Sequence, residues 1–462
     1  MLKECHTKMD KIQVSPNIEL PYNCPSCKNE LVPSDWYING MRCIIDIECN
    51  NCINNYYAEF PTNAGLLYPG IIDKTTMNRA DDLPFDNWYL NGFLDSCRHQ
   101  KNYEIEFIIK KNRKLGSKKI AILNTIDETY GHSLYELFNA SHFLEQTDLD
   151  LILIVQKNIS WLVPEGCAEV WILDLPFKSA GDWNNWITTR IKEELKGYKE
   201  IYICRTFVQQ DSSDFNICDY TKIKPFNLNN WDSLLVKPTI TFIWRKDRFW
   251  KNVLPGFLNN RYILKIFRRV LKPLENLIQF YWILNFANRL KYMIPNVDFA
   301  ISGMDDRRYK LPHWIKDFRF PNHTDENAIS QAKRYAESHL VIGCNGSSLL
   351  LPGCLAGAMI NIVPNDQWAV SAGSFPFRIT SVGDTHFRYV MLPKEIKIDR
   401  LIQISLSILR DRSLILLTTT KPWRDHDSIL SPLEYAKDRI NAHNLINLFN
   451  STNGLITSKK KK

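Results

Sequence analysis

Residues 337–364 read ESHLVIGCNGSSLLLPGCLAGAMINIVP, and no other part of the chain says as much about its architecture. They predict an apolar strand at residues 339–343, a turn of small polar residues, a compact helix and a second apolar strand that ends at Pro364. The turn consists of Asn345, Gly346, Ser347 and Ser348. Its small side chains let a ligand approach the backbone, and unpaired N–H groups at the start of the following helix favour an anion such as phosphate. An ordinary strand-to-helix turn has the same features, so the surrounding pattern has to decide between the two interpretations.

Apolar runs alternate with amphipathic helical patterns over two regions of the chain. In the first region the predicted strands are residues 120–124, 149–155, 169–173 and 201–204, and the predicted helices are 134–145 and 183–195. In the second region, strands at 239–244 and 298–302 and a helix at 325–337 precede the stretch quoted above. Buried strands that alternate with helices indicate parallel, doubly wound sheets. We therefore predict an α/β protein with two Rossmann-like domains, residues 76–236 and 237–425, followed by a C-terminal helix and basic tail at 426–462.

Two C-x2-C knuckles near the N-terminus predict a metal site. Their ligands would be Cys24, Cys27, Cys49 and Cys52, with the isolated Cys43 as a weaker substitute. Each knuckle sets two thiolates on one tight turn, and two such turns complete a tetrahedral zinc site. Four thiolates leave no open position on the metal, so we expect a structural zinc ribbon with its linker in residues 1–75 and no catalytic metal. Acidic side chains outnumber basic ones in residues 20–60, which favours an architectural or partner-docking module over a nucleic-acid-binding one.

The chain of 462 residues has room for two or three domains, and its net charge is +8. That charge is local, because four lysines end the chain and residues 257–294 hold seven basic side chains against one glutamate. The rest of the chain is close to neutral, so we expect no nucleic-acid partner. There is neither a signal-peptide pattern nor an apolar run of about 18 residues. Six of the twelve cysteines are scattered singly, which is typical of reduced thiols, and we expect a cytoplasmic protein.

Residues 257–294 are predicted to form an amphipathic insertion in the second domain. The apolar side chains at helical spacing are Ile263, Phe267, Val270 and Leu274, continued by Leu277, Tyr281 and Leu284. The basic side chains on the other face are Lys265, Arg268, Arg269 and Lys272, and Pro273 is expected to kink or restart the helix. Such a helix can contact an anionic membrane, which would place the protein peripherally at the inner face of a membrane. Packing of the apolar face on the sheet is the favoured alternative.

Three predicted strands of the second region run into polar groups suited to a nucleotide. The first is followed by Arg245, Asp247 and Arg248, the second by Ser302 and Asp305, and the third by the turn at residues 345–348. Arginine grips a diphosphate with two parallel hydrogen bonds, and carboxylates can hold ribose hydroxyls. In open α/β sheets, ligands bind past the carboxyl ends of the strands. Each segment alone has a structural explanation, but together they predict a nucleotide diphosphate site.

With these motifs the chain resembles the GT-B glycosyltransferases, and within them the fucosyltransferase-like branch. The resemblance covers about residues 119–400 and rests on the order W-R-x-D-R, a strand into S-G, and a strand into N-G-S-S before a helix. It implies that Arg245 holds the donor diphosphate, that Ser347 and Ser348 contact it, and that Asp305 lies near the base or ribose. The chain departs from the family pattern in two ways. Ile243 stands where the family often has His, and a long insertion follows Arg248.

The resemblance also implies a reaction without a catalytic metal, so a general base is needed to activate the acceptor hydroxyl. His132, in a loop after the first predicted strand, is the candidate, with Asp127 and Glu128 as rivals; His323 and His386 are weaker candidates. The expected reaction is transfer of a sugar from a nucleotide-sugar donor to a polysaccharide or glycolipid acceptor. Two alternatives stay open, a non-enzymatic adaptor whose ribbon binds partners or nucleic acid, and a nucleotide-sugar epimerase.

Overall fold

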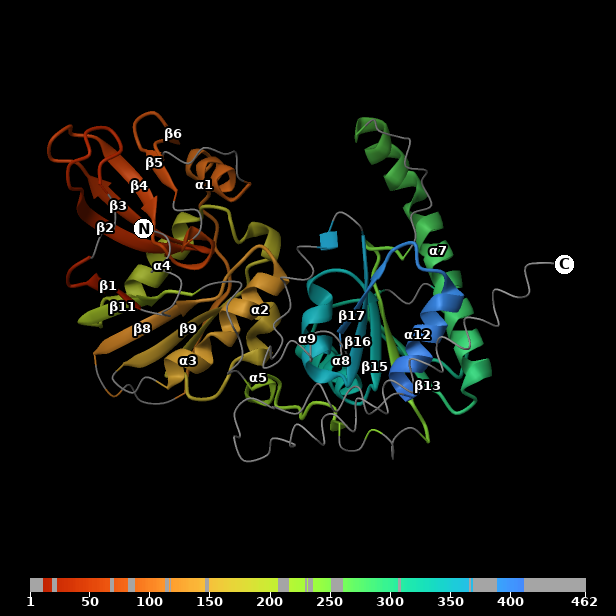
Figure 1. The fold of residues 1–462 in the computed structure, drawn as a ribbon. Coiled ribbons are helices and arrows are strands. Elements are labelled where there is room, and N and C mark those ends of the chain that lie inside the picture. The colour runs from red at the N-terminus through yellow and green to blue at the C-terminus, as the bar shows by residue number, and fades with distance from the viewer. Residues whose placement is uncertain are drawn as a thin grey trace, which may run out of the picture.

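The structure is a computed structural model. It describes residues 11–18, 23–66, 70–81, 88–112, 116, 118–145, 149–206, 216–228, 231, 236–250, 261–305, 309–364, 367–368 and 389–410. The predicted C-terminal helix and tail at 426–462 lie outside the described residues, as does His386. The described chain forms two α/β lobes side by side, with a small antiparallel sheet on the first lobe (Figure 1).

The sheet of the N-terminal lobe has six strands in the order β1-β11-β8-β9-β10-β7. They are β1 (Lys11–Ser15), β7 (Phe107–Lys111), β8 (Lys119–Asn124), β9 (Asp150–Gln156), β10 (Glu169–Leu173) and β11 (Glu200–Cys204). The four central strands are parallel, whereas β1 and β7 pair antiparallel at the two edges. The four central strands were predicted from the sequence. β1 falls in the segment assigned to the ribbon, so this segment contributes one strand to the first lobe.

Side chains alternate between the two faces of this sheet and so build two separate cores. Ala121 and Leu123 face α2 (Tyr130–Phe138), α3 (Ala140–Leu144) and α5 (Ile217–Thr221). Ile120 and Ile122 face α4 (Asn185–Leu195) and the ribbon. The helix predicted at 134–145 is broken at Asn139, because the Asn139 side chain donates to the carbonyls of Tyr135 and Glu136 and competes with the helical pattern.

The ribbon sheet is antiparallel, with its strands in chain order, and α1 (Trp88–Arg98) follows it. Its strands are β2 (Val32–Asn39), β3 (Arg42–Glu48), β4 (Asn55–Glu59), β5 (Ile71–Asp73) and β6 (Asn78–Arg79). One face of β3 and β4 packs on the N-terminal sheet, because Ile45, Ile47 and Ala58 share a buried cluster with Ile120 and Trp171. The ribbon is therefore fixed to the first lobe through an apolar core.

The sheet of the C-terminal lobe has six parallel strands in the order β14-β13-β12-β15-β16-β17. They are β12 (Thr239–Trp244), β13 (Asp298–Met304), β14 (Lys316–Phe320), β15 (Leu340–Cys344), β16 (Ala358–Val363) and β17 (Tyr389–Pro393). The chain starts at β12, builds outward to β14, and then returns to the other side of β12 with β15. The strand order thus reverses between β12 and β15, and such a reversal opens a crevice at the carboxyl ends of the two strands.

Among the described residues, four helices cover the C-terminal sheet. The helices α8 (Asp325–Ala336) and α9 (Leu350–Leu355) lie on the face toward the first lobe, and α7 (Arg261–Met293) and α12 (Ile398–Arg410) lie on the other face. Phe226 and Trp231 already pack with α7 and α12, so the chain has entered the second lobe before the predicted boundary at 236/237.

The predicted amphipathic insertion is one long helix, α7, and Pro273 lies inside it. Its buried face consists of Phe280, Ile283, Phe286, Ala287 and Leu290, which pack on the sheet. The predicted packing of this segment on the sheet is confirmed for that half. The predicted apolar stripe is wrong in detail, because Leu274 and Tyr281 are 44% and 62% exposed and lie on the opposite side of the helix. Among the described helices, none combines the length and the apolar character needed to cross a membrane.

Candidate functional site

The four knuckle cysteines converge as predicted. Their sulfur atoms all lie within 4.8 Å of one another, and Cys43 does not belong to the group. Cys24 Sγ lies 3.5 Å from Cys52 Sγ, and Cys27 Sγ lies 3.4 Å from Cys49 Sγ. Metal–sulfur bonds of about 2.3 Å in a tetrahedron require sulfur atoms roughly 3.8 Å apart, so the donor set has the size of a four-thiolate metal site.

The two knuckles have the same local structure. Lys28 N donates to Cys24 O and Ile53 N donates to Cys49 O, both at 2.9 Å. Lys28 and Ile53, each directly after the second cysteine of its knuckle, have positive φ angles of 61° and 59°. This left-handed residue closes each turn so that both of its thiols point to the same side. The repeated C-x2-C pattern therefore predicted not only the ligands but also their geometry.

In the second lobe, Arg245 and the turn at residues 345–348 meet at the reversal of strand order. Arg245 follows β12, the turn follows β15, and Arg245 Nη1 donates to Ser348 Oγ at 3.0 Å. Gly346 has a φ of +114°, and a Cβ atom there would lie 2.7 Å from Arg245 Nη1 and 3.3 Å from Arg248 Nε. Both guanidinium groups therefore lie against the glycine, past the carboxyl ends of β12 and β15, which is where doubly wound sheets generally bind their ligands.

The charges at this crevice are not balanced within the described residues. Arg245 makes a bidentate pair with Asp247, with Nε–Oδ1 and Nη2–Oδ2 distances of 2.9 and 2.6 Å. Burial and the neighbouring Arg245 charge lower the pKa of Arg248, whose Nη1 donates to Gln367 Oε1. Burial alone would raise the pKa of Asp247, but its hydrogen bonds to Arg245 hold that pKa below the usual value. Two guanidinium groups share one half-exposed carboxylate, so an added anion is favoured here.

Three residues that the sequence analysis did not single out shape this crevice. Gln279 of α7 donates to the carbonyls of Arg245 and Arg248, at 3.3 and 3.0 Å, and so fixes the loop after β12. Asn361 of β16 accepts the N–H of Asn345, and Gln367 accepts hydrogen bonds from both Asn345 and Arg248. All three are amides distant in sequence from the groups they hold, and no local pattern indicates such a partner.

The structure corrects the predictions for Ser302 and Asp305. Ser302 is fully buried, and its hydroxyl lies 2.7 Å from Tyr335 Oη inside the lobe. Asp305 is 2% exposed; its Oδ2 accepts from Arg319 Nη1 at 3.0 Å and its Oδ1 lies 2.8 Å from Lys246 Nζ. Ser302 lies within β13 and Asp305 directly after it, and β13 is on the far side of β12 from the reversal of strand order. Their roles are therefore structural.

The predicted helix after the turn is shorter than the phosphate-binding argument requires. The turn leads into a single 3-10 turn, η5 (Ser347–Leu349), and then into α9, which has six residues. Such short elements have little dipole. Any affinity for an anion at this crevice therefore comes from Arg245, Arg248 and the Ser348 hydroxyl.

In the first lobe, the candidate base and its acidic neighbour lie together at the carboxyl end of β8. His132 Nδ1 lies 3.2 Å from Asp127 Oδ1, and the His132 side chain is 34% exposed whereas Asp127 is buried. Asp127 is held in place, because its Oδ1 accepts from Thr129 N at 2.7 Å and its own N–H donates to Gln156 Oε1. The two groups lie within ion-pair distance, although His132 Nδ1 makes no hydrogen bond to a described residue, so the pair supplies the components of a general base beside a fixed carboxylate.

The candidate residues of the first lobe and those of the second lobe come into contact at Gly131. A Cβ atom on Gly131 would lie 2.8 Å from Ser347 Cβ and 3.0 Å from Leu350 Cδ1. Gly131 lies inside α2, and the absence of a side chain there permits this close contact. His132 therefore sits one residue away from a direct contact with the turn at residues 345–348 of the other lobe.

Gly131→Val should push the two lobes apart at their contact. The added side chain has no room against Ser347 and Leu350, and overpacking of this kind costs about 1–3 kcal/mol. We expect a lower unfolding temperature and a larger radius of gyration by X-ray scattering. Gly197→Val is the matched control, since a Cβ atom at Gly197 meets nothing within 4 Å. Equal behaviour of the two variants would contradict the close contact.

Glu136, one turn after His132, is fully buried, and neither carboxyl oxygen has a hydrogen-bond partner among the described residues. Burial, reinforced by the Asp127 charge, raises the pKa of Glu136 well above its usual value of 4.5. The folded protein therefore releases this proton at a higher pH than the unfolded chain, which loses it near the usual value. The side chain makes the fold less stable as the pH rises.

Glu136→Gln should stabilise the protein at neutral and alkaline pH. Glutamine has the shape of the neutral acid but no proton to lose. Its advantage over the parent in free energy of unfolding should grow by up to about 1.4 kcal/mol per pH unit above about pH 4.5, until the folded-state pKa is reached. Chemical unfolding at several pH values measures this. The exposed Glu145→Gln serves as the control, and a pH-independent difference for Glu136→Gln would refute the assignment.

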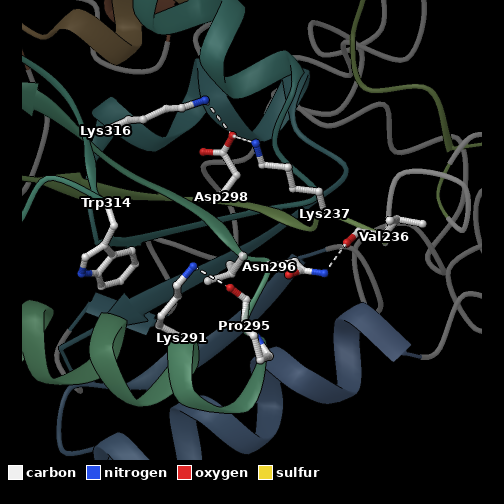
Figure 2. A pocket seen from close by; sticks show the side chains of 9 residues that line it. Val236, Lys237, Lys291, Pro295, Asn296, Asp298, Trp314 and Lys316 are labelled. Atoms are coloured by element: carbon white, nitrogen blue, oxygen red, sulfur yellow. Dashed lines mark hydrogen bonds and ion pairs between the residues drawn. The ribbon is translucent and has the colours of Figure 1, made fainter.

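A further hollow of about 490 Å³ lies at the opposite, amino-terminal edge of the C-terminal sheet (Figure 2). Lys237, Lys291 and Lys316 line it together with Asp298 and Trp314. Lys316 Nζ lies 2.7 Å and Lys237 Nζ 3.8 Å from Asp298 Oδ2, and Lys291 donates to Pro295 O. Each ammonium group thus has a partner within the protein. We therefore place the candidate site at Arg245 and not in this hollow.

Comparison with known proteins adds no further constraint. No protein-family model matches the chain, and no curated protein matches it significantly. The candidate site therefore rests on its own geometry.

Proposed function

We propose that the chain is a glycosyltransferase of the GT-B type. In this proposal the two lobes are Rossmann-like domains, the second binds the diphosphate of a nucleotide-sugar donor, and the first supplies the general base. The main support for this proposal is that the candidate donor-binding residues of the second lobe lie against the segment of the first lobe that holds the candidate base. Arg245 bonds to Ser348 at the reversal of strand order, and Gly131, the residue before His132, lies against Ser347 of the same turn. The acceptor would be the hydroxyl of a polysaccharide or glycolipid.

The positions of these residues suggest a separate role for each in the proposed reaction. Arg245 and Arg248 would stabilise the negative charge that grows on the leaving diphosphate. Ser348, already hydrogen-bonded to Arg245, would hold the same group from the other side of the crevice. His132, which lies beside Asp127, would accept the proton of the attacking hydroxyl. Asp247 accepts hydrogen bonds from two nitrogen atoms of Arg245. When the donor binds, phosphate oxygens would replace the Asp247 carboxylate at these nitrogen atoms.

For the ribbon we propose a structural zinc ion held by the four cysteines. All four ligands are thiols, and none of the described neighbours offers a position for a reacting water. Asn29 Nδ2 approaches Cys27 Sγ at 3.5 Å, and Tyr56 Oη lies 3.6 Å from Cys24 Sγ. These contacts orient the sulfur atoms, which is the usual role of the groups around a metal–thiolate site.

The first experiment is a thermal-shift and calorimetric screen against nucleoside mono- and diphosphates and their sugars, followed by product analysis. Release of nucleoside diphosphate supports transfer. A rearranged sugar nucleotide without diphosphate release would support an epimerase instead. If no nucleotide binds, the proposal fails, and salt-dependent binding to a generic polyanion would then support the adaptor.

His132→Gln should lose transfer while keeping the donor. Removal of a general base lowers the turnover number by about 10²- to 10⁴-fold, whereas donor affinity depends on the other lobe. Initial rates of nucleoside diphosphate release, together with calorimetric donor affinity, measure the two effects separately. His323→Gln is the matched control. If His323→Gln loses activity and His132→Gln does not, the assignment of the base is wrong.

A further inference from the structure

The strand order of the N-terminal sheet also reverses. The ribbon occupies the space at the carboxyl ends of the two strands where this reversal takes place. The chain builds β8, β9 and β10 in one direction and returns with β11 on the other side of β8. Asn63, in η1 (Asn63–Leu66) after the last long ribbon strand, lies between the ends of β8 and β11. Its N–H donates to Thr206 O at 2.9 Å, and its Nδ2 donates to Asn124 O at 3.2 Å. The Thr206 hydroxyl donates to Asn63 Oδ1.

A second turn of the ribbon docks beside the first. Asn124 Nδ2 donates to Gly40 O at 3.0 Å, and Met41 N donates to Ala180 O at 2.9 Å. Gly40 has a φ of +57°, and a Cβ atom there would lie only 2.2 Å from Ala180 O. The ribbon therefore reaches the loops after β8, β10 and β11 with buried backbone and amide groups. These are the groups that a bound ligand would use in an empty crevice.

The same contacts connect the metal cluster to the candidate base. β4 runs from the second knuckle to Asn63, and Tyr56 on β4 lies 3.6 Å from the thiol of Cys24. At the other end, Asn124 Oδ1 accepts the N–H of Ile126, the residue before Asp127. One amide, Asn124, thus contacts both the ribbon and the loop that leads to Asp127 and His132.

We propose that the ribbon occupies the N-terminal crevice in place of a ligand and that its metal positions the loop of Asp127 and the first turn of α2, which carries His132. The chain then binds one nucleotide, in the C-terminal lobe, although it has two reversals of strand order. Asn63, Asn124 and Thr206 are positioning residues. The occupancy of the crevice follows from the contacts alone, whereas the effect on catalysis rests on the proposed function.

The test that is independent of activity is hydrogen–deuterium exchange of the full chain with zinc and after chelation. Zinc removal should speed exchange in residues 124–138, while β12 and β15 stay protected. Unchanged exchange in 124–138 would overturn the coupling. Calorimetric titration with uridine, guanosine, cytidine and adenosine diphosphates should give one site per chain, and two sites would show that the N-terminal crevice is open. If none of them binds, the proposed function fails, but the exchange result still decides the coupling.

Variants separate positioning from folding. Asn63 has a φ of +52°, so Asn63→Gly removes the side-chain hydrogen bonds without adding backbone strain. We expect the turnover number to fall by about 10- to 100-fold with donor affinity unchanged. Thr206→Val should have a similar effect, and Thr206→Ser, which keeps the hydroxyl, should restore the parent value. Thr75→Ala, on an exposed turn of the ribbon, is the surface control. An equal fall for Thr206→Val and Thr206→Ser would refute the role of this hydrogen bond.

Discussion

Replacement of Cys49 and Cys52 by serine should abolish metal binding and lower the unfolding temperature of the whole chain. The two thiols complete the four-sulfur cluster with Cys24 and Cys27. Structural zinc supplies about 10–16 kcal/mol of apparent binding free energy in small zinc-binding peptides, which is as large as the total stability of a typical domain. Because the ribbon shares a buried core with the N-terminal sheet, its loss exposes Ile120 and Trp171 as well.

Metal content by mass spectrometry and the unfolding temperature by calorimetry measure the two effects. Cys43→Ala is the matched control for metal content. Cys43 is a buried ribbon cysteine outside the cluster, and burial raises the pKa of its thiol to about 12. That variant should keep one metal per chain. Full metal content after loss of Cys49 and Cys52, or no thermal effect of chelation, would contradict the structural role.

Arg245→Ala should reduce the affinity for nucleoside diphosphates by at least about tenfold. Arginine hydrogen bonds to a charged group contribute about 1.5–3 kcal/mol each, and the variant removes more than one donor from the crevice. The fold should stay intact, since the side chain is one-fifth exposed and its carboxylate partner is half-exposed. Calorimetric titration with the diphosphate that binds the parent measures the loss.

Asp247→Asn tests the same ion pair by removing the charge of the carboxylate partner of Arg245. It removes the carboxylate charge and one of the two oxygens that accept from Arg245, so the diphosphate should bind at least as tightly as in the parent. Weaker binding would mean that the Asp247 carboxylate itself contacts the nucleotide, as the sequence analysis predicted. Unchanged affinity in Arg245→Ala would remove the basis for the donor site.

The strands with continuous apolar runs were predictable, and the strands at sheet edges were not. β8, β10 and β12 match their predicted positions to within one residue, because strands buried on both faces leave an unmistakable apolar run. β1, β7 and β14 are edge strands with polar residues, and their pairing depends on distant partners. The break at Asn139 was hidden because the apolar spacing continues across it.

The candidate site was predictable where topology alone brings residues together. Strand ends at a reversal of strand order must meet, so Arg245 and the turn at 345–348 could be paired from sequence. The same reasoning gave too much weight to Ser302 and Asp305, because the position of β13 in the sheet was not known. Gln279 and the contact of Gly131 with Ser347 depend on how α7 and the two lobes pack, which no local pattern records.

One buried cluster runs through both lobes, from Leu123 and Leu134 on one side to Val341 and Leu350 on the other. Large opening motions would expose this shared apolar cluster to water. The cost is about 25 cal/mol of free energy for each Å² of apolar surface exposed. The lobes are therefore expected to melt together and to form a preorganised cleft. A substrate bound in one lobe would then protect the other against heat and proteolysis without any change of shape.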